Sequence, residues 1–336
     1  MLRWCRVSVS ILAALALGGC QGWQSALDPR GPKASAIAEL FWIFTGICAV
    51  VWVLVVIFLA MAIWRRRGER PDPLVTDAAQ ERRITSVVGT FVGLTAITLI
   101  ALTALSYAGQ KQLFDTKEGD VTLKITGHQW WWEVNYEDSD PQRSFTTANE
   151  IHIPAGEPVR IKLESSDVIH SFWVPSLMGK QDLITGRQNL IEIKADREGV
   201  YRGQCAEFCG WQHALMSILV IAHPKEEFEA WRNQQISARQ PPEDEERKEG
   251  ERIFLSKPCV MCHTVRGTSA GSNIGPDLTH VGARSTIAAA TLPTNVGSLA
   301  AWISDPQAIK PGSKMPAVKI EADDLQALAA YLEGLK

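Results

Sequence analysis

The sequence predicts three kinds of structure along one chain: a hairpin of two membrane helices, an all-β sandwich and a small all-α domain. The hairpin is predicted because residues 40–64 and 84–108 are apolar and carry no charged side chain. Between residues 120 and 223, short runs of alternating apolar and polar residues are separated by Gly, Pro and Asp turns, as in a sandwich. Residues 249–256 and 322–335 have helical patterns. A chain of 336 residues is long enough for these parts.

The N-terminal segment has the pattern of a secretory signal. Arg3 and Arg6 precede the apolar run 7–17, and small residues follow before Cys20. The final Leu-Gly-Gly-Cys resembles the lipobox of bacterial lipoproteins. That resemblance implies removal of residues 1–19 and acylation of Cys20. An ordinary signal with an incidental cysteine is the alternative.

Each apolar run is long enough to cross a bilayer. At about 1.5 Å per residue, either 25-residue run covers a hydrocarbon core of roughly 30 Å. The second run is rich in Thr, Ser and Gly, which suits close packing on another membrane helix. A buried soluble helix is the alternative, but the length and the lack of charge disfavour it. We therefore expect a transmembrane hairpin over residues 39–109.

The loop between the two runs determines the expected orientation. It carries six arginines: Arg65, Arg66, Arg67, Arg70, Arg82 and Arg83. The positive-inside rule makes the loop 65–83 cytoplasmic, so both ends of the chain lie outside. The signal peptide requires the same orientation. We expect a protein of the bacterial inner (plasma) membrane, with residues 20–38 and both soluble domains on the periplasmic or extracellular side.

The soluble part divides once more. Residues 238–249 combine Pro241 and Pro242 with a run of charges, a composition that forms a linker and not a core. The expected parts are a β domain at 110–223, a helix and linker at 224–246, and a second domain at 247–336. The formal net charge of −3 does not suggest binding to nucleic acid.

A group of potential metal ligands lies in the β domain. Cys205, Cys209, His213 and Met216 occur within twelve residues, and His170 lies 35 positions before Cys205. One His before a Cys, His and Met is the ligand order of a single-copper cupredoxin site. The additional thiol allows two thiolates and two imidazoles to hold two coppers, with both sulfurs bridging. Met216 would be a weak axial ligand, and a loop carbonyl could complete the second copper.

Such a site is suited to electron transfer and not to chemistry on a substrate, because sharing one electron over two metals limits the change in geometry. Two alternatives remain. Two Cys and two His can form a structural zinc site, although zinc would leave Met216 without a role. A disulfide between Cys205 and Cys209 is possible in the periplasm.

Three segments, 127–132, 167–172 and 205–216, resemble subunit II of the haem-copper cytochrome c oxidases, and the likeness extends over about 36–223. It implies a cupredoxin-like Greek-key sandwich with a dinuclear CuA centre. The implied copper ligands are His170, Cys205, Glu207, Cys209, His213 and Met216. Glu207 would contribute its backbone carbonyl to copper and its carboxylate to a magnesium ion at the interface with the catalytic subunit.

The resemblance also implies a role for Trp130, at the position where electrons enter from a cytochrome c. The alternative is a tryptophan of the core or of a docking face. One departure from the family is Thr185-Gly186, where Pro-Gly is usual. Because Pro would fix φ, we expect a loop of different shape there.

The second soluble domain contains Cys259-Val-Met-Cys262-His263, the attachment motif of c-type haem. The two thiols add to the haem vinyl groups, and His263 is the proximal ligand. Zinc would require further ligands, and no cysteine follows Cys262. Met315 is the only methionine after the motif and is the expected sixth ligand, with His280 as the alternative.

Gly-Pro-Asp-Leu at 275–278 and Met-Pro at 315–316 resemble the small class I cytochromes c. That likeness implies helices around the haem. It agrees with the helical patterns at 249–256 and 322–335.

Together these parts predict the non-catalytic electron-transfer subunit of a proton-translocating cytochrome c oxidase in a respiratory chain. Electrons would pass from a cytochrome c or another donor to haem c, to CuA and to the haem of catalytic subunit I, which reduces oxygen to water. Further oxidase subunits are expected partners, and nucleic acid is not. The alternatives are the CuA subunit of another membrane reductase, such as nitric oxide reductase, and a non-redox copper-binding protein.

Overall fold

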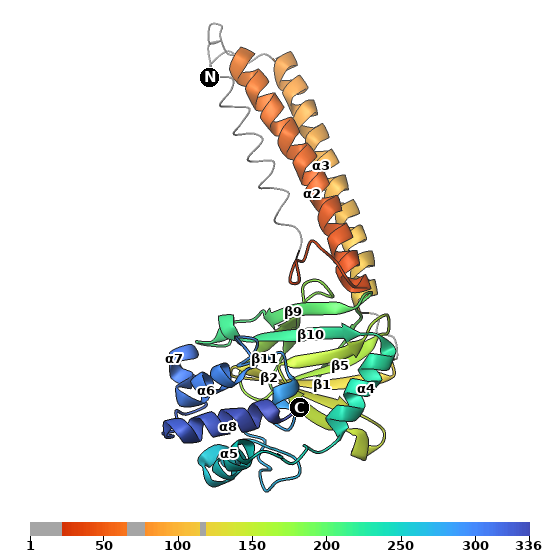
Figure 1. Ribbon diagram of the computed structural model, residues 1–336. Coiled ribbons are helices and arrows are strands. Elements are labelled where there is room, and N and C mark those ends of the chain that lie inside the picture. The colour runs from red at the N-terminus through yellow and green to blue at the C-terminus, as the bar shows by residue number, and fades with distance from the viewer. Residues whose placement is uncertain (1–21, 66–77, 115–118) are drawn as a thin grey trace, which may run out of the picture. The chain divides into compact units, whose positions relative to one another are not determined.

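The computed structural model describes residues 22–65, 78–114 and 119–336 (Figure 1). The predicted signal 1–19, the acylation of Cys20 and loop residues 66–77 lie outside the described residues. The chain forms two compact units, residues 36–115 and the remainder. We describe each unit by itself.

The first unit is a pair of long helices, α2 (Pro32–Arg65) and α3 (Ala78–Phe114). Both are long and apolar enough to cross a membrane. Each helix is longer than its charge-free run. The first turns of α3 include Arg82, because the Ala, Gln, Glu and Arg residues there are good helix formers. The hydroxyl of Thr90 donates to the carbonyl of Ser86 at 2.9 Å, which satisfies a polar group on an apolar helix.

The second unit contains a sandwich of two five-stranded sheets. In one sheet the order is β3 (Phe145–Ala148), β2 (Trp131–Glu137), β1 (Val121–His128), β5 (Val159–Ser165) and β8 (Asn189–Ile193). In the other it is β4 (Glu150–Pro154), β10 (Ser217–His223), β9 (Gly199–Cys205), β6 (His170–Trp173) and β7 (Gln181–Leu183). The pairs β1–β5 and β4–β10 are parallel and the others antiparallel. The alternating runs at 121–125 and 159–163 lie in β1 and β5, and β8 contains all but the last residue of the run at 190–194.

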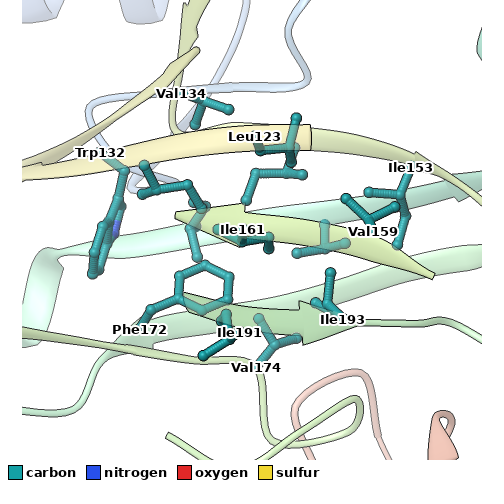
Figure 2. Packing of buried hydrophobic residues seen from close by; sticks show 14 of the residues in the cluster. Leu123, Trp132, Val134, Ile153, Val159, Ile161, Phe172, Val174, Ile191 and Ile193 are labelled. Atoms are coloured by element: carbon teal, nitrogen blue, oxygen red, sulfur yellow. The ribbon is translucent and has the colours of Figure 1, made fainter. Parts of the chain in front are cut away.

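The sandwich core follows from this alternation. In β1 and β5 every second residue is buried, so each strand turns one apolar face inward. Figure 2 shows the two inner faces meeting, with Leu123 and Ile161 from one sheet and Phe172 from the other, and with Val174 directly after β6. The rings of Trp132 and Phe172 are 6.0 Å apart in an edge-to-face arrangement. The predicted all-β sandwich is confirmed.

Helix α4 (Lys225–Ile236) packs on β4 and β10 and leads through residues 237–244 to the C-terminal domain. That domain contains α5 (Glu245–Ser256), α6 (Val296–Ser304), α7 (Pro306–Ile309) and α8 (Ala322–Gly334), with the short pair β11 (Thr286–Ile287) and β12 (Leu292–Pro293). The Asp244 carboxylate caps α5 by accepting from the Arg247 amide at 2.8 Å. Phe254 of α5 packs against Tyr331 of α8. The small helical domain is confirmed.

Four short 3-10 helices complete the described elements: η1 (Pro141–Arg143), η2 (His213–Leu215), η3 (Pro258–Met261) and η4 (Val281–Ala283). Two of them lie within the motifs singled out above. Helix η2 contains His213 of the ligand-rich loop, and η3 contains the first cysteine of the haem motif.

Candidate metal centre and haem pocket

The expected metal ligands come together because three neighbouring strands begin or end at the same place. His170 is the first residue of β6, Cys205 is the last of β9, and β10 begins directly after Met216. The strands are antiparallel neighbours, so these positions share one edge of the sheet. Residues 206–216, called the copper loop below, connect β9 to β10 and carry the remaining candidates. The β-sandwich that holds this loop is called the copper domain, and residues 247–336 are called the haem domain.

Short distances separate the donor atoms. The Cys205 and Cys209 sulfurs are 3.8 Å apart. The Cys205 sulfur is 3.9 Å from His170 Nδ1 and 3.2 Å from the Glu207 carbonyl oxygen. The Cys209 sulfur is 3.7 Å from His213 Nδ1 and 3.9 Å from the sulfur of Met216. All six expected ligands therefore lie in one cluster: His170, Cys205, Glu207, Cys209, His213 and Met216.

Four of the six candidates are shielded from water, and Glu207 and His213 are partly exposed. His170 and Met216 are 0% exposed, Cys205 is 1% exposed and Cys209 is 3% exposed. No disulfide joins Cys205 to Cys209, since both are free thiols. The disulfide alternative does not describe this structure.

Asp167 positions the His170 ring. Its Oδ1 is 2.8 Å from Nε2 of His170, so Nδ1 faces the thiols. Gly127 of β1 provides space on the other side, because a Cβ there would lie 2.8 Å from Cδ2 of His170. Such an outer carboxylate is the usual support of a metal-binding imidazole. We overlooked Asp167 as a site residue in the sequence, although its place three residues before the histidine was visible.

Hydrogen bonds set the charge of the two thiols and of Asp167. The hydrogen bond between the two thiols, acting against burial, lowers the pKa of Cys205. The neighbouring Cys205 and burial together raise the pKa of Cys209. Burial opposes ionisation of Asp167, but hydrogen bonds from His170 and two backbone amides hold its pKa below the usual range. The Asp167 carboxylate and the more acidic of the two thiols therefore flank His170.

The donor set fits soft metal ions. Two ligand atoms on one metal, each bonded at about 2.0–2.3 Å, lie roughly 3.3–3.8 Å apart. The separations of 3.2–3.9 Å within the cluster have this size. Thiolate, thioether and imidazole together are the ligands of a copper electron-transfer site, and zinc would not require the thioether of Met216.

Trp130 lies directly beside the loop. Its indole Nε1 donates to the Cys209 carbonyl at 2.9 Å, and the Gln129 side-chain amide donates to the same oxygen at 2.8 Å. Thr185, at the position where the family usually has proline, makes a hydrogen bond of its own. Its hydroxyl donates to the Asp167 carbonyl at 2.5 Å, a bond that proline could not form.

The haem motif is prepared for an iron ligand. His263 Nδ1 is 2.8 Å from the carbonyl oxygen of Pro276, which leaves Nε2 for a metal. Burial lowers the pKa of His263 and favours the neutral imidazole that binds iron. Cys259 and Met315 are partly buried and pack on the same apolar cluster. These residues fit a covalently attached haem.

His280 is used in another way. It is 4% exposed, and its Nε2 is 3.0 Å from the Ser237 carbonyl in the segment after α4. Burial is the main cause that lowers its pKa. This hydrogen bond ties the connecting segment to the helical domain and favours Met315 over His280 as the sixth ligand.

Lys310 is a second residue that we did not single out in the sequence. It is only 3% exposed, and its ammonium group contacts backbone carbonyls of both soluble domains. Its partners lie 22, 95 and 180 positions away in the sequence. No local pattern could have identified it.

Comparison with known proteins gives a consistent result. Residues 138–223 match the family described as cytochrome c oxidase subunit II, periplasmic domain, and residues 247–336 match cytochrome c. A cytochrome c oxidase subunit 2 from Alkalihalophilus pseudofirmus is 37% identical over 96% of this chain and 94% of its own length. The corresponding protein from Bacillus sp. strain PS3 is 32% identical over 100% of this chain and 98% of its own length.

A solved periplasmic domain of cytochrome oxidase subunit II from Bradyrhizobium japonicum is 32% identical. The match covers 36% of this chain and 96% of that chain, with a TM-score of 0.34.

The fold and the site define a membrane-anchored electron-transfer subunit that combines a copper-type β-sandwich with a helical cytochrome c domain. The two relatives match almost the whole chain, and the chain belongs to the cytochrome c oxidase subunit II family. Subunit II works within a haem-copper oxidase complex. Its two soluble domains imply copper and haem as cofactors.

Proposed function

We propose that this subunit carries electrons from an external donor through a haem c to a dinuclear CuA centre and on to the haem of catalytic subunit I. The proposed copper ligands are His170, Cys205, Cys209, His213 and Met216, with the Glu207 carbonyl. Cys259 and Cys262 hold the haem covalently, with His263 and Met315 as its axial ligands. When bound, the copper pair and the haem supply reversible one-electron chemistry.

One observation carries the proposal: two buried thiols 3.8 Å apart, each with an imidazole nitrogen within 3.9 Å. This arrangement allows both sulfurs to bridge two metals. The sandwich holds the donors in position and excludes water, and Asp167 fixes the His170 ring. A site held in one geometry changes little between its two charge states, which favours rapid electron transfer.

Several finer roles belong to the same proposal. Trp130, hydrogen-bonded to the Cys209 carbonyl, conducts electrons toward the copper loop. The Glu207 carboxylate binds magnesium at the interface with subunit I. Acylated Cys20 anchors the N-terminus, and both soluble domains lie on the periplasmic side. Other oxidase subunits and a cytochrome c or similar donor are the partners.

The central test is electron paramagnetic resonance of the oxidised oxidase purified from native membranes. We expect the hyperfine pattern of one unpaired electron shared equally by two copper nuclei. A pattern from a single copper, or zinc in place of copper by metal analysis, would contradict the proposal.

A pair of cysteine variants links the signal to the site. Cys209→Ser should abolish the shared-copper signal and stop reduction of subunit I, while haem c remains reducible by the donor. Cys48→Ser in α2 is the matched control, because it removes an exposed thiol from the other unit and should change neither signal nor turnover. Unchanged turnover in Cys209→Ser would exclude copper from the electron path.

A further inference from the structure

The haem domain contacts the copper domain through a buried lysine. Lys310 follows α7 and is 3% exposed. Its ammonium group donates to three carbonyl oxygens: Trp130 at 3.1 Å, Leu215 at 2.9 Å and Ala288 at 3.2 Å. An ammonium group has three hydrogens, so these three acceptors satisfy it completely. Two of the acceptors belong to the copper domain, and Leu215 directly precedes the ligand Met216.

The third acceptor belongs to an unusual turn. Ala288, Ala289 and Ala290 have φ values of 54°, 59° and 57°, a left-handed conformation that residues with a Cβ rarely adopt. The carbonyl of Ala288 accepts from Lys310, and that of Ala289 accepts from the Ser217 amide of β10 at 3.3 Å. Strained backbone persists where the surrounding contacts impose it, and it occurs mainly at functional sites.

Residues 310–314 make further contacts with the loop 206–216 and with Asp167. The Gln212 side-chain amide donates to the Pro311 carbonyl at 2.5 Å, and Lys314 pairs with Asp167 at 3.2 Å. Gly312 has φ +84°, and a Cβ there would lie 3.3 Å from the Trp211 ring. The next residue after this segment is Met315, the proposed haem ligand.

We propose that residues 288–290 and 310–314 form an internal docking surface that holds the haem domain on the copper loop for electron transfer, with Lys310 as its positioning residue. The inference rests on the proposed function, since it assigns a role in the step between the two redox centres. The hydrogen-bond partners on the copper side all lie next to ligands. Trp130 contacts the Cys209 carbonyl, and Asp167 contacts His170. Gln212, Leu215 and Ser217 are neighbours of His213 or Met216 in the sequence.

The chemistry of Lys310 indicates that it orients the two domains and does not mainly stabilise the fold. Burying an ammonium group is costly, and here burial lowers the pKa of Lys310 to about 8. An apolar side chain would fill the same space at lower cost. Three carbonyls in a fixed arrangement, in contrast, accept a lysine in one orientation only. The three hydrogen bonds of Lys310 therefore fix the position of one domain relative to the other.

Three identical substitutions in one stretch of chain test the inference in the purified holo-oxidase. Lys310→Met removes the buried group, Lys314→Met removes the half-exposed ion pair, and Lys319→Met changes an exposed lysine beyond the surface. A photosensitiser injects one electron into haem c, and its transfer is followed by haem reoxidation and by the absorbance of the copper centre.

We expect Lys310→Met to slow this transfer at least about tenfold, as loss of a buried charged donor at an interface does. Lys314→Met should slow it less, and Lys319→Met should leave it unchanged. Both redox centres should keep their spectra in all three variants. A wild-type rate in Lys310→Met, or equal slowing in Lys319→Met, would overturn the inference.

A second variant protects the test against misfolding. Gly312→Val places a side chain against Trp211 at an exposed turn and should also slow transfer while both centres stay intact. If Lys310→Met loses haem or copper, a wild-type rate in Gly312→Val overturns the inference. A wild-type enzyme without the shared-copper signal would instead refute the proposed function itself, so the two failures are distinguishable.

Discussion

The copper loop and the haem pocket are supported in different ways. The copper candidates lie at the adjoining ends of three strands, and Cys205 and Cys209 are almost fully buried in the sandwich core. In the haem domain, Cys259 and Cys262 are only half-buried, and they lie in and directly after a short 3-10 helix. The donor atoms around the copper loop already have the spacing expected of ligands that share a metal ion. The residues of the haem pocket are partly exposed and pack against a smaller apolar core.

The difference indicates which site depends on its cofactor for folding. A sandwich whose two sheets are joined by a continuous apolar core can keep its shape without metal. A small helical domain with partly exposed apolar residues around its motif gains much of its burial from the haem. We therefore expect copper to bind to a formed site and haem to complete its own domain.

Removal of haem attachment should have the largest effect. Cys259→Ala with Cys262→Ala should abolish covalently bound haem and lower the melting temperature of the helical domain by more than about 10 °C. Hydrogen exchange would locate the loss of protection in α5 and α8. Removal of copper by a chelator is the matched comparison, and the sandwich should stay protected. If copper removal cost the sandwich as much protection as haem removal costs the helical domain, the two sites would not differ in their dependence on the cofactor.

Loss of the sixth haem ligand should have the next largest effect. Met315→Leu keeps the apolar contacts but removes the sulfur, so the haem reduction potential should fall by on the order of 0.1 V. Potentiometric titration would measure the shift. His280→Ala is the control, because that imidazole bonds to the Ser237 carbonyl. A shifted potential in the control, with an unchanged one in Met315→Leu, would make His280 the axial ligand.

A smaller effect is expected at the support of the copper site. Asp167→Asn weakens the bond to His170 Nε2 and should lower copper affinity about 10- to 100-fold, as loss of an outer-shell partner does. Competition with a chelator would measure the affinity. Lys314→Met removes the ion-pair partner of Asp167 and should leave copper affinity unchanged. Undiminished copper affinity in Asp167→Asn would mean that the sandwich alone orients His170.

Sequence patterns predicted the features of this molecule that depend on residues close together in the chain. Period-two alternation located β1, β5 and β8, and charge-free runs located the two long helices. The two ligand motifs were visible because their residues lie close together in the chain. The structure brings His170 to the loop because β6 and β9 are neighbours, which ligand order alone could suggest but not establish.

The contacts between the domains were not predictable in this way. Lys310 has the same local appearance as an exposed lysine, and its role depends on carbonyls of distant residues. The left-handed turn at 288–290 contains only alanines, which have no preference for that conformation. Glu150 accepts from the amides and hydroxyls of Ser285 and Thr286 across the interface. Such features arise from tertiary packing, for which one sequence carries no periodic signal.

The smallest expected effect concerns the pH dependence of this interface. His152 stacks on Trp231 and is hydrogen-bonded to His223 at 2.7 Å, and it also faces Glu150 and Arg284. Burial is the largest cause that lowers its pKa, although Glu150 acts in the opposite direction. Below the unfolded pKa of about 6.5, the unfolded chain therefore takes up a proton that the folded protein resists. Stability consequently decreases as the pH is lowered.

Thermal unfolding of the holo-oxidase as a function of pH would measure this contribution. His152→Phe retains a flat ring against Trp231 but cannot titrate, so the melting temperature should depend less steeply on pH just below about 6.5. At about pH 8 the imidazole is neutral in both states, and the variant there reports the change in packing alone. An equally steep dependence in the variant would place the acid sensitivity elsewhere. Glu150 is the next candidate, because hydrogen bonds outweigh burial and lower its pKa, so its contribution would be lost only at still lower pH.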